Sequence, residues 1–123
     1  MPLESLVLSE RSLIISGKLL SAFANSRRLL ILSVLSRGEV CVGDLANALG
    51  MSHSALSQHL SKLRAQNLVK RRRDAQTIYY SSSSEAVLKV LKALSEIYPE
   101  ANFDELELDA HGKAGSECPV ISD

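Results

Sequence analysis

The change of hydrophobic period along the chain is the feature that most limits what it can fold into. Across residues 8–65 the apolar side chains recur at the three- and four-residue spacing of α-helices. In the runs 69–73 and 77–81 the period becomes two, which predicts two short strands joined as a hairpin. Helical spacing then returns in residues 84–98. The sequence therefore predicts a mainly α-helical fold in the order helix, helix, helix, helix, hairpin, helix.

Four helices are expected ahead of the hairpin. The first, residues 8–24, is apolar on more than one face, which indicates burial on two sides. A second helix follows the cap-type residues 25–26, and a third, of barely two turns, ends at Gly50. Ser52 is a natural N-cap for the fourth. The apolar stripe of this fourth helix consists of Leu56, Leu60 and Leu63.

The third and fourth helices are joined by a three-residue turn. A short helix, a tight turn and an amphipathic helix make a helix-turn-helix, in which the second helix enters the major groove of DNA. Opposite its apolar stripe, the fourth helix carries short or amide-bearing side chains that suit phosphates and base edges. Any one of them alone is more simply explained as a polar surface residue. The candidate DNA contacts here are His53, Ser54, Ser57, Gln58, Ser61, Lys62 and Arg64.

Charge is distributed unevenly along a chain whose formal net charge is zero. Residues 1–98 hold 13 Lys and Arg against 7 Asp and Glu, a net charge of +6, and residues 99–123 carry a net charge of −6. From Lys62 to Arg73 no acidic residue interrupts the basic ones. A solvated surface explains such a run in isolation, but beside a recognition helix the run predicts phosphate binding.

The hairpin supplies a second predicted contact with DNA. In a winged helix-turn-helix the hairpin lies along the neighbouring backbone or reaches into the minor groove, whose negative potential attracts arginine. If Tyr79 faces outward, Ile78 and Tyr80 face the core. The candidate contacts in this wing are Arg71, Arg72, Arg73 and Gln76.

One domain is expected for residues 1–98, because 123 residues are too few for two cores. The acidic remainder, residues 99–123, is expected to stay disordered. Broad apolar faces on the first and last helices, on a chain with a small core, predict a homodimer. The predicted interface consists of Leu13, Leu19, Phe23, Leu91, Leu94 and Tyr98.

Two segments of the chain resemble the ArsR/SmtB family of winged-helix repressors. They are EVCVGDLA at residues 39–46, and SHSALSQHL at residues 52–60 followed by KLR at 62–64. The resemblance covers roughly residues 19–98 and implies a homodimeric repressor in the bacterial cytoplasm, at the nucleoid. It further implies that the fourth helix and the wing recognise a palindromic operator in double-stranded DNA.

No metal or other cofactor is expected. Family members that sense soft metals place Cys-x-Cys at the start of the third helix, and here Gly43 takes the second cysteine position. The zinc-type site of the last helix needs histidine, which residues 84–98 lack. His53 and His59 lie about 120° apart around their helix, so they do not share a face.

Several other functional classes are not expected. The chain has no G-x-S-x-G, no Gly-rich phosphate loop and no histidine beside a cysteine, which argues against an enzyme. No apolar run approaches the roughly 18 to 20 residues of a membrane span, and no secretory signal pattern is visible. Cys41 and Cys118 form no CxxC pair and make no disulfide scaffold. A cytoplasmic protein is therefore expected.

Two alternatives to a metal-independent repressor stay open. Cys41 lies near a helix N-terminus, where the helix dipole lowers a thiol pKa, so a thiol-responsive repressor is one alternative. A small buried hydrophobe is the simpler explanation of a lone cysteine in an apolar setting. The second alternative is a protein-interaction module that kept the winged fold and lost DNA binding, with the acidic tail engaging a basic partner.

Overall fold

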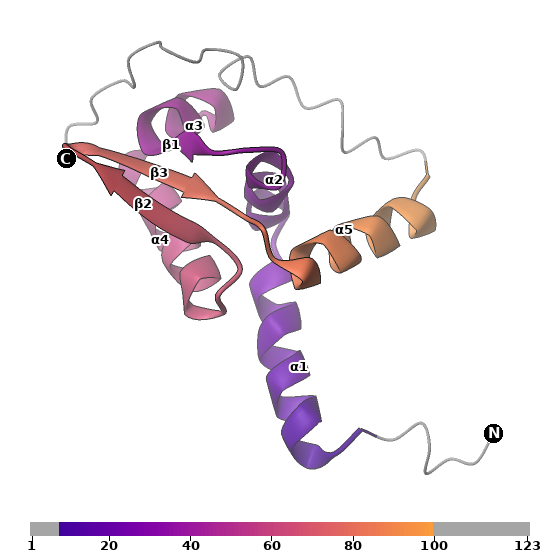
Figure 1. Cartoon of the computed structure of the whole chain (residues 1–123). Helices are drawn as coiled ribbons and strands as arrows, with labels where there is room; N and C mark the ends of the chain where they lie inside the picture. The colour runs from indigo at the N-terminus through magenta and orange to yellow at the C-terminus, as the bar shows by residue number, and fades with distance from the viewer. Residues whose placement is uncertain (1–7, 100–123) are drawn as a thin grey trace.

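The predicted order of elements is observed, with one short strand added. The structure is a computed structural model that describes residues 8–99 (Figure 1). Its elements are α1 (Glu10–Phe23), α2 (Ser26–Leu35), β1 (Val40–Cys41), α3 (Val42–Leu49), α4 (His53–Ala65), β2 (Lys70–Asp74), β3 (Thr77–Ser81) and α5 (Glu85–Ile97). No helix within this described part is long and apolar enough to cross a membrane. The winged helix-turn-helix fold predicted from the sequence is confirmed.

Polar caps fix where the helices begin. Asn25 ends an extended segment, and its Oδ1 accepts from the backbone amides of Arg27 and Arg28 at 2.9 and 3.1 Å. Ser52 Oγ accepts from the backbone amide of Ala55 at 3.1 Å and so starts α4. Ser84 caps α5 in the same way. Of these caps, Asn25 and Ser52 are the ones that the sequence predicts.

Two residues in the left-handed conformation flank α4. Gly50 ends α3 with φ of 61°, and the amide of Met51 donates back to Ala46 O at 3.0 Å. Asn67 follows α4 with φ of 58°, a conformation that asparagine tolerates better than most residues. The chain therefore turns sharply at both ends of α4.

The sheet has three strands rather than the two predicted. β3 is central and pairs antiparallel with β1 on one side and with β2 on the other. The hairpin turn is also shorter than expected, because Asp74 pairs with Thr77 and leaves only residues 75–76 unpaired. Two-residue strands such as β1 are too short to show a period, so the sequence could not reveal this one.

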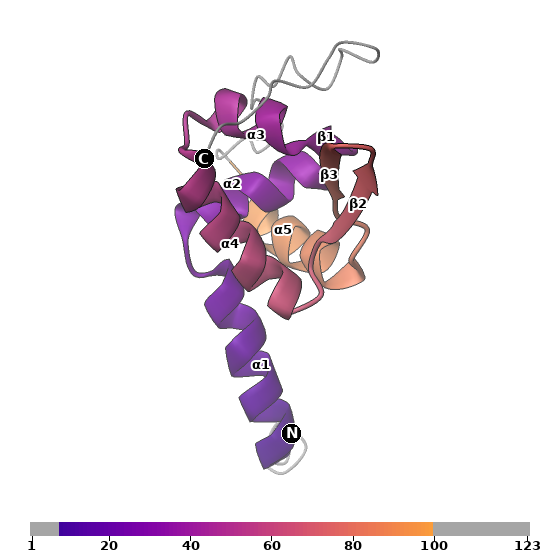
Figure 2. The same cartoon turned by 90° about the vertical axis from the view of Figure 1, so that its left-hand side faces the viewer.

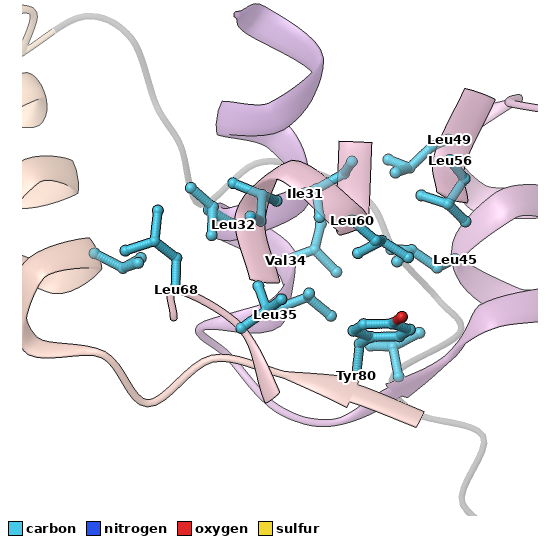
Figure 3. Close-up of a cluster of buried hydrophobic side chains, with 14 of the residues drawn as sticks. Ile31, Leu32, Val34, Leu35, Leu45, Leu49, Leu56, Leu60, Leu68 and Tyr80 are labelled. Carbon is cyan, nitrogen blue, oxygen red and sulfur yellow. The ribbon is translucent and has the colours of Figure 1, made fainter. Parts of the chain in front are cut away.

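The core is arranged around α2. Ile31, Leu32 and Leu35 are almost completely buried, and Figure 3 shows them between side chains from α3, α4 and β3. Tyr80 of β3 is buried and Ile78 packs against the same core, which confirms the predicted inward face of this strand. The buried stripe of α4, also confirmed, is Leu56, Leu60 and Leu63.

The first helix departs from its prediction of burial on two sides. Figures 1 and 2 show α1 projecting from the body, and within it only Ala22 and Phe23 are buried. Apolar side chains more than half exposed in the described part of the chain are Leu8, Leu13, Ile14, Ile15, Leu20, Leu88, Ile97 and Tyr98, all on or beside α1 and α5. The most buried helix is α2 instead, whose buried residues are Arg28, Ile31, Leu32, Ser33, Val34 and Leu35.

The predicted domain boundary lies at the edge of the described part. The predicted acidic tail, residues 99–123, lies outside the described residues except for Pro99. Of the predicted interface residues, Phe23 already belongs to the core of the single chain, and Leu19 and Leu91 pack partly against that core. Leu13 and Tyr98 are exposed, with 53% and 60% of their surface accessible.

Candidate nucleic-acid interface

The outer face of α4 carries the predicted recognition residues. Its buried stripe turns the opposite face outward, and there Ser54, Ser57, Gln58, Ser61, Lys62 and Arg64 are all exposed. His53 at the first position is half-buried. Short side chains on this face let the backbone approach a DNA groove, and the Gln58 amide offers both a donor and an acceptor to a base edge. Ser54, Gln58, Ser61 and Lys62 thus lie on the side opposite the buried stripe, Ser57 and Arg64 lie nearer its edge, and His53 is not fully part of this surface.

The N-terminal end of α2 holds this face in place through two arginines. Arg27 Nη1 donates to Leu49 O at the end of α3, at 3.3 Å. Arg28 is 93% buried, and its guanidinium donates to the carbonyls of Ala22 and Ser21 at 2.8 and 3.1 Å. Its remaining nitrogen, Nη1, lies 3.3 Å from His59 Nδ1 on α4. One side chain therefore contacts α1 and α4 from α2.

The charge state of His59 follows from these surroundings. Partial burial lowers the pKa of His59 first, and the nearby charges of Arg28, Lys62 and Arg27 lower this pKa further. The neutral ring is therefore favoured. We did not expect Arg28 or His59 to matter from the sequence. The available signal was two arginines in the first turn of a helix, at the positive end of its dipole, where cations are unfavourable.

The wing places its arginines on two different faces. The register pairs Arg71 with Tyr80 and Arg73 with Ile78, so these two arginines share the face that turns toward the core. Arg72 pairs with Tyr79 on the other face. The arginines lie in β2 beyond the core, and all three are exposed. Gln76 in the turn is exposed as well.

Arg72 is bound to the protein itself. Its guanidinium makes a bidentate ion pair with Glu39, with Nε and Nη2 at 2.9 and 2.7 Å from the carboxylate oxygens. The same group lies 4.5 Å from the centre of the Tyr79 ring. The hydrogen bond from Arg72 is the main reason that the pKa of Glu39 is lowered. Sequence reasoning missed Glu39, which stands 33 residues away from its partner.

Arg71 and Arg73 are both exposed, so their guanidinium groups are accessible to a ligand. Arg73 Nε donates to Ala75 O at 3.0 Å, which directs this side chain along the turn of the wing. Figure 2 shows the β2–β3 hairpin beside α4, joined to it through the loop that follows the C-terminal end of α4. The exposed face of α4 and the basic strand β2 therefore form one candidate surface.

Cys41 and the other candidate metal ligands are spread over the described part of the chain. Among residues 8–99 no three His, Cys, Asp or Glu side chains lie together in a way that could hold a metal ion. Cys41 is 4% exposed and disulfide-bonded. The expected burial of Cys41 is therefore confirmed, whereas the expectation that the cysteines take no part in a disulfide is wrong.

Comparison with known proteins assigns this arrangement to a family. The model of the bacterial regulatory proteins of the arsR family matches residues 25–71. Nodulation protein NolR of Rhizobium meliloti is 69% identical over 84 residues, which cover 68% of this chain and 69% of NolR. Transcriptional activator HlyU of Vibrio cholerae is 48% identical, over 68% of this chain and 78% of HlyU. The chain belongs to the ArsR family.

Solved structures of ArsR-type regulators support the fold. The crystal structure of NolR from Sinorhizobium fredii superposes with a TM-score of 0.71 at 63% identity, covering 75% of this chain and 95% of that one. The homodimeric winged helix-turn-helix domain of Mb0332 from Mycobacterium bovis, solved by NMR, gives a TM-score of 0.66 at 32% identity, over 76% and 89% of the two chains. The chain is thus a DNA-binding transcriptional regulator and not an enzyme.

Proposed function

We propose that this ArsR-family chain represses transcription by binding as a homodimer to a palindromic operator. In this proposal α4 enters the major groove, and Arg71 and Arg73 of the wing contact the adjacent phosphate backbone. The observation that carries the proposal is the outer face of α4, where exposed Ser and Gln side chains stand opposite a fully buried apolar stripe and beside a basic strand.

The exposed apolar residues of α1 and α5 support the dimer. A single chain leaves Leu13, Leu20 and Leu88 more than half exposed, and an isologous interface between two copies would cover such side chains. The Mycobacterium bovis relative is homodimeric. A two-fold axis between the copies would bring two α4 helices to half-sites about 34 to 36 Å apart. Light scattering that finds a folded monomer at micromolar concentration would contradict this assembly.

Operator recognition is tested by selecting bound sites from a random DNA pool. We expect a palindromic site, and we expect Gln58→Ala to change the preferred bases at a cost of about 1 to 3 kcal/mol at each affected position. Lys89→Ala is a matched control, because Lys89 is an exposed residue of α5 rather than of the candidate surface. An unchanged site and affinity in Gln58→Ala would show that α4 is not the reading helix.

The same binding assay separates a regulator from an interaction module. Each phosphate contact releases counterions, so operator affinity should fall steeply with salt, with a slope of about −0.9 per contact. An interaction module that lost DNA binding would show no such slope. A reporter gene placed behind the selected operator should be more active when the chain is absent. The opposite response would make the chain an activator.

A thiol response is the second candidate function, and it is favoured by the bonded state of Cys41. Cys41 in β1 pairs with Tyr79 in β3, whose ring lies under Arg72 of the wing. Opening the disulfide would therefore act on the strand that holds the wing. Under this candidate, a reductant changes operator affinity of the wild type by several-fold and leaves Cys41→Ser unaffected. Equal effects of the reductant on both proteins would rule it out.

A further inference from the structure

Three helices meet at the guanidinium of Arg28. In Figures 1 and 2 the C-terminal end of α1 reaches the body beside α2 and α4. Arg28 occupies this junction with Nε on Ala22 O, Nη2 on Ser21 O and Nη1 next to His59 Nδ1. The first two acceptors belong to the last turn of α1, and His59 lies in the middle of α4.

Placing the charge of Arg28 at this junction is energetically unfavourable, which indicates that its hydrogen bonds are needed there. An arginine in the first turn of α2 stands at the positive end of the helix dipole, and burial of its charge is unfavourable as well. Both costs are offset only if the guanidinium is satisfied by hydrogen bonds. The carbonyls of Ser21 and Ala22 lie in the last turn of α1, at the negative end of its dipole, and Ser21 O also accepts from the backbone amide of Ala24 at 3.2 Å. Arg28 thereby caps α1 from the neighbouring helix.

The contact with α4 depends on the protonation state of His59. A guanidinium only donates, so Nδ1 of His59 must accept, which requires the neutral ring with its proton on Nε2. A second proton would remove this acceptor and put a positive ring beside Arg28. The other charged groups near His59 are Arg27 of α2 and Lys62 of α4, and both are also positive. Nothing in this set favours the charged ring.

We infer that Arg28 is a positioning residue for operator binding, which fixes the recognition helix α4 to the C-terminal end of α1 through the neutral ring of His59. This inference rests on the proposed function. Since α1 is the helix proposed for the dimer interface, the contact links the spacing of the two copies to the orientation of each α4. Protonation of His59 would break the link on the α4 side and leave the cap on α1 intact.

The test compares His59 with an acceptor that cannot be protonated. The background protein carries His53→Gln and His111→Gln, so His59 is its only histidine. The matched variant adds His59→Asn, whose amide oxygen accepts in the place of Nδ1. The operator is the site selected with the background protein itself. For both proteins we measure affinity for this operator and for random DNA, at pH 7.5 and at pH 5.0.

The ratio of the two affinities is the decisive quantity. A protonated His59 adds one positive charge near DNA, which raises affinity for any sequence and cancels in the ratio. Misplacement of α4 affects only the operator. We expect the ratio to fall by about 3- to 10-fold between pH 7.5 and pH 5.0 in the background protein, in line with the loss of part of one base contact. In His59→Asn the ratio should stay constant.

A second measurement does not involve DNA. Nitrogen NMR of His59 in the background protein should show the neutral tautomer with its proton on Nε2 at pH 7.5. Because the pKa of His59 is lowered in the fold, the unfolded chain binds more protons below its ordinary pKa of about 6.5. The Tm should therefore fall as the pH decreases below 6.5, and it should fall less in His59→Asn.

The possible outcomes distinguish a failure of the contact between Arg28 and His59 from a failure of the proposed function. A proton on Nδ1, or identical pH profiles of Tm in the two proteins, would overturn the contact between Arg28 and His59. An equal fall of the affinity ratio in both proteins would overturn the positioning role. If the background protein shows the expected tautomer but the unmodified chain selects no DNA site, the proposed function is overturned, and with it the role in binding, while the contact between Arg28 and His59 stands.

Discussion

Arg28 and Arg72 each attach one half of the candidate DNA surface to the body of the protein, but in opposite surroundings. Arg28 is buried at the junction of three helices, where it bonds two backbone carbonyls and a neutral histidine. Arg72 is exposed on the wing, where it meets a carboxylate and an aromatic ring. The recognition helix is thus anchored by the buried charge of Arg28, and the wing is anchored by the solvent-exposed ion pair of Arg72.

The difference in solvent decides what each contact contributes. Removal of a buried donor leaves its acceptors without a partner, and this costs stability. Water replaces a lost partner at the surface, so an exposed ion pair adds less to stability than a buried contact. We therefore expect the anchor of α4 to control folding and specificity, and the anchor of the wing to control mainly how much positive charge is available to DNA.

The largest expected effect is that of Arg28→Ala. It removes the side-chain donor to Ala22 O and one of the two donors to Ser21 O and opens space at the junction, so we expect a loss of about 2 to 4 kcal/mol in the free energy of unfolding. Urea denaturation at a fixed protein concentration measures it. Arg27→Ala is the control, because exposed Arg27 makes one backbone hydrogen bond and should cost less than about 1.5 kcal/mol. Equal losses of unfolding free energy in the two variants would contradict the special contribution of the buried Arg28.

A smaller effect separates the arginines of the wing. We expect Arg71→Ala to weaken binding to every DNA sequence and to reduce the salt slope by about one. Arg72→Ala should change the slope by less, because Glu39 already neutralises that guanidinium. Binding titrations from low to moderate salt measure both slopes. If Arg72→Ala had the larger effect, the ion pair with Glu39 would have to open when DNA binds.

Glu39→Gln tests the role of the Arg72–Glu39 ion pair through an expected gain in DNA affinity rather than a loss. The substitution keeps the shape of the side chain, removes one negative charge and releases Arg72 for phosphate contact. We expect about a 2- to 5-fold gain in affinity for random DNA at low salt, a gain that shrinks as added salt screens the charges. Thermal unfolding should be nearly unchanged. A clear drop in Tm would show that this pair stabilises the fold as well.

The smallest expected effect is a titration shift. Because the Arg72 hydrogen bond lowers the pKa of Glu39, the ion pair is intact above the ordinary carboxylate range and is lost as the pH falls through the lowered pKa. The wing anchor should therefore not respond between pH 7.5 and pH 5.0, the window in which His59 is expected to respond. NMR titration of the Glu39 carboxyl should show its pKa rising to the ordinary range in Arg72→Ala. An unchanged pKa would contradict the pair.

Local patterns predicted most of the fold and one half of the site. The caps Asn25, Ser52 and Ser84 act within their own helices, and the stripe of α4 repeats every three or four residues, so both are visible in the sequence. The exposed face of α4 follows from the buried one by helical geometry alone. In the same way, the alternation of side chains along a strand made the predicted inward side of β3 correct.

Contacts between distant residues could not be predicted in this way. Glu39 and Arg72 are 33 residues apart, and Arg28 and His59 are 31 apart, so no local period connects them. A run of basic residues in the sequence indicates positive charge, but it does not indicate which partner each side chain contacts. The same limit applies to the prediction for the first helix. An apolar helix face has the same sequence pattern whether it packs against its own chain or against another chain.

The sequence by itself determined the order of the elements, their ends and the face of α4 that is exposed, because capping, helical period and strand alternation act over a few residues. Only the tertiary structure decided which charges remain available to a ligand. It set Arg72 against Glu39 and buried Arg28 under α4, while Arg71 stayed exposed. The reason is physical: the strength of a charge depends on its partners and on the water around it, and both come from chain segments that meet only in the folded protein.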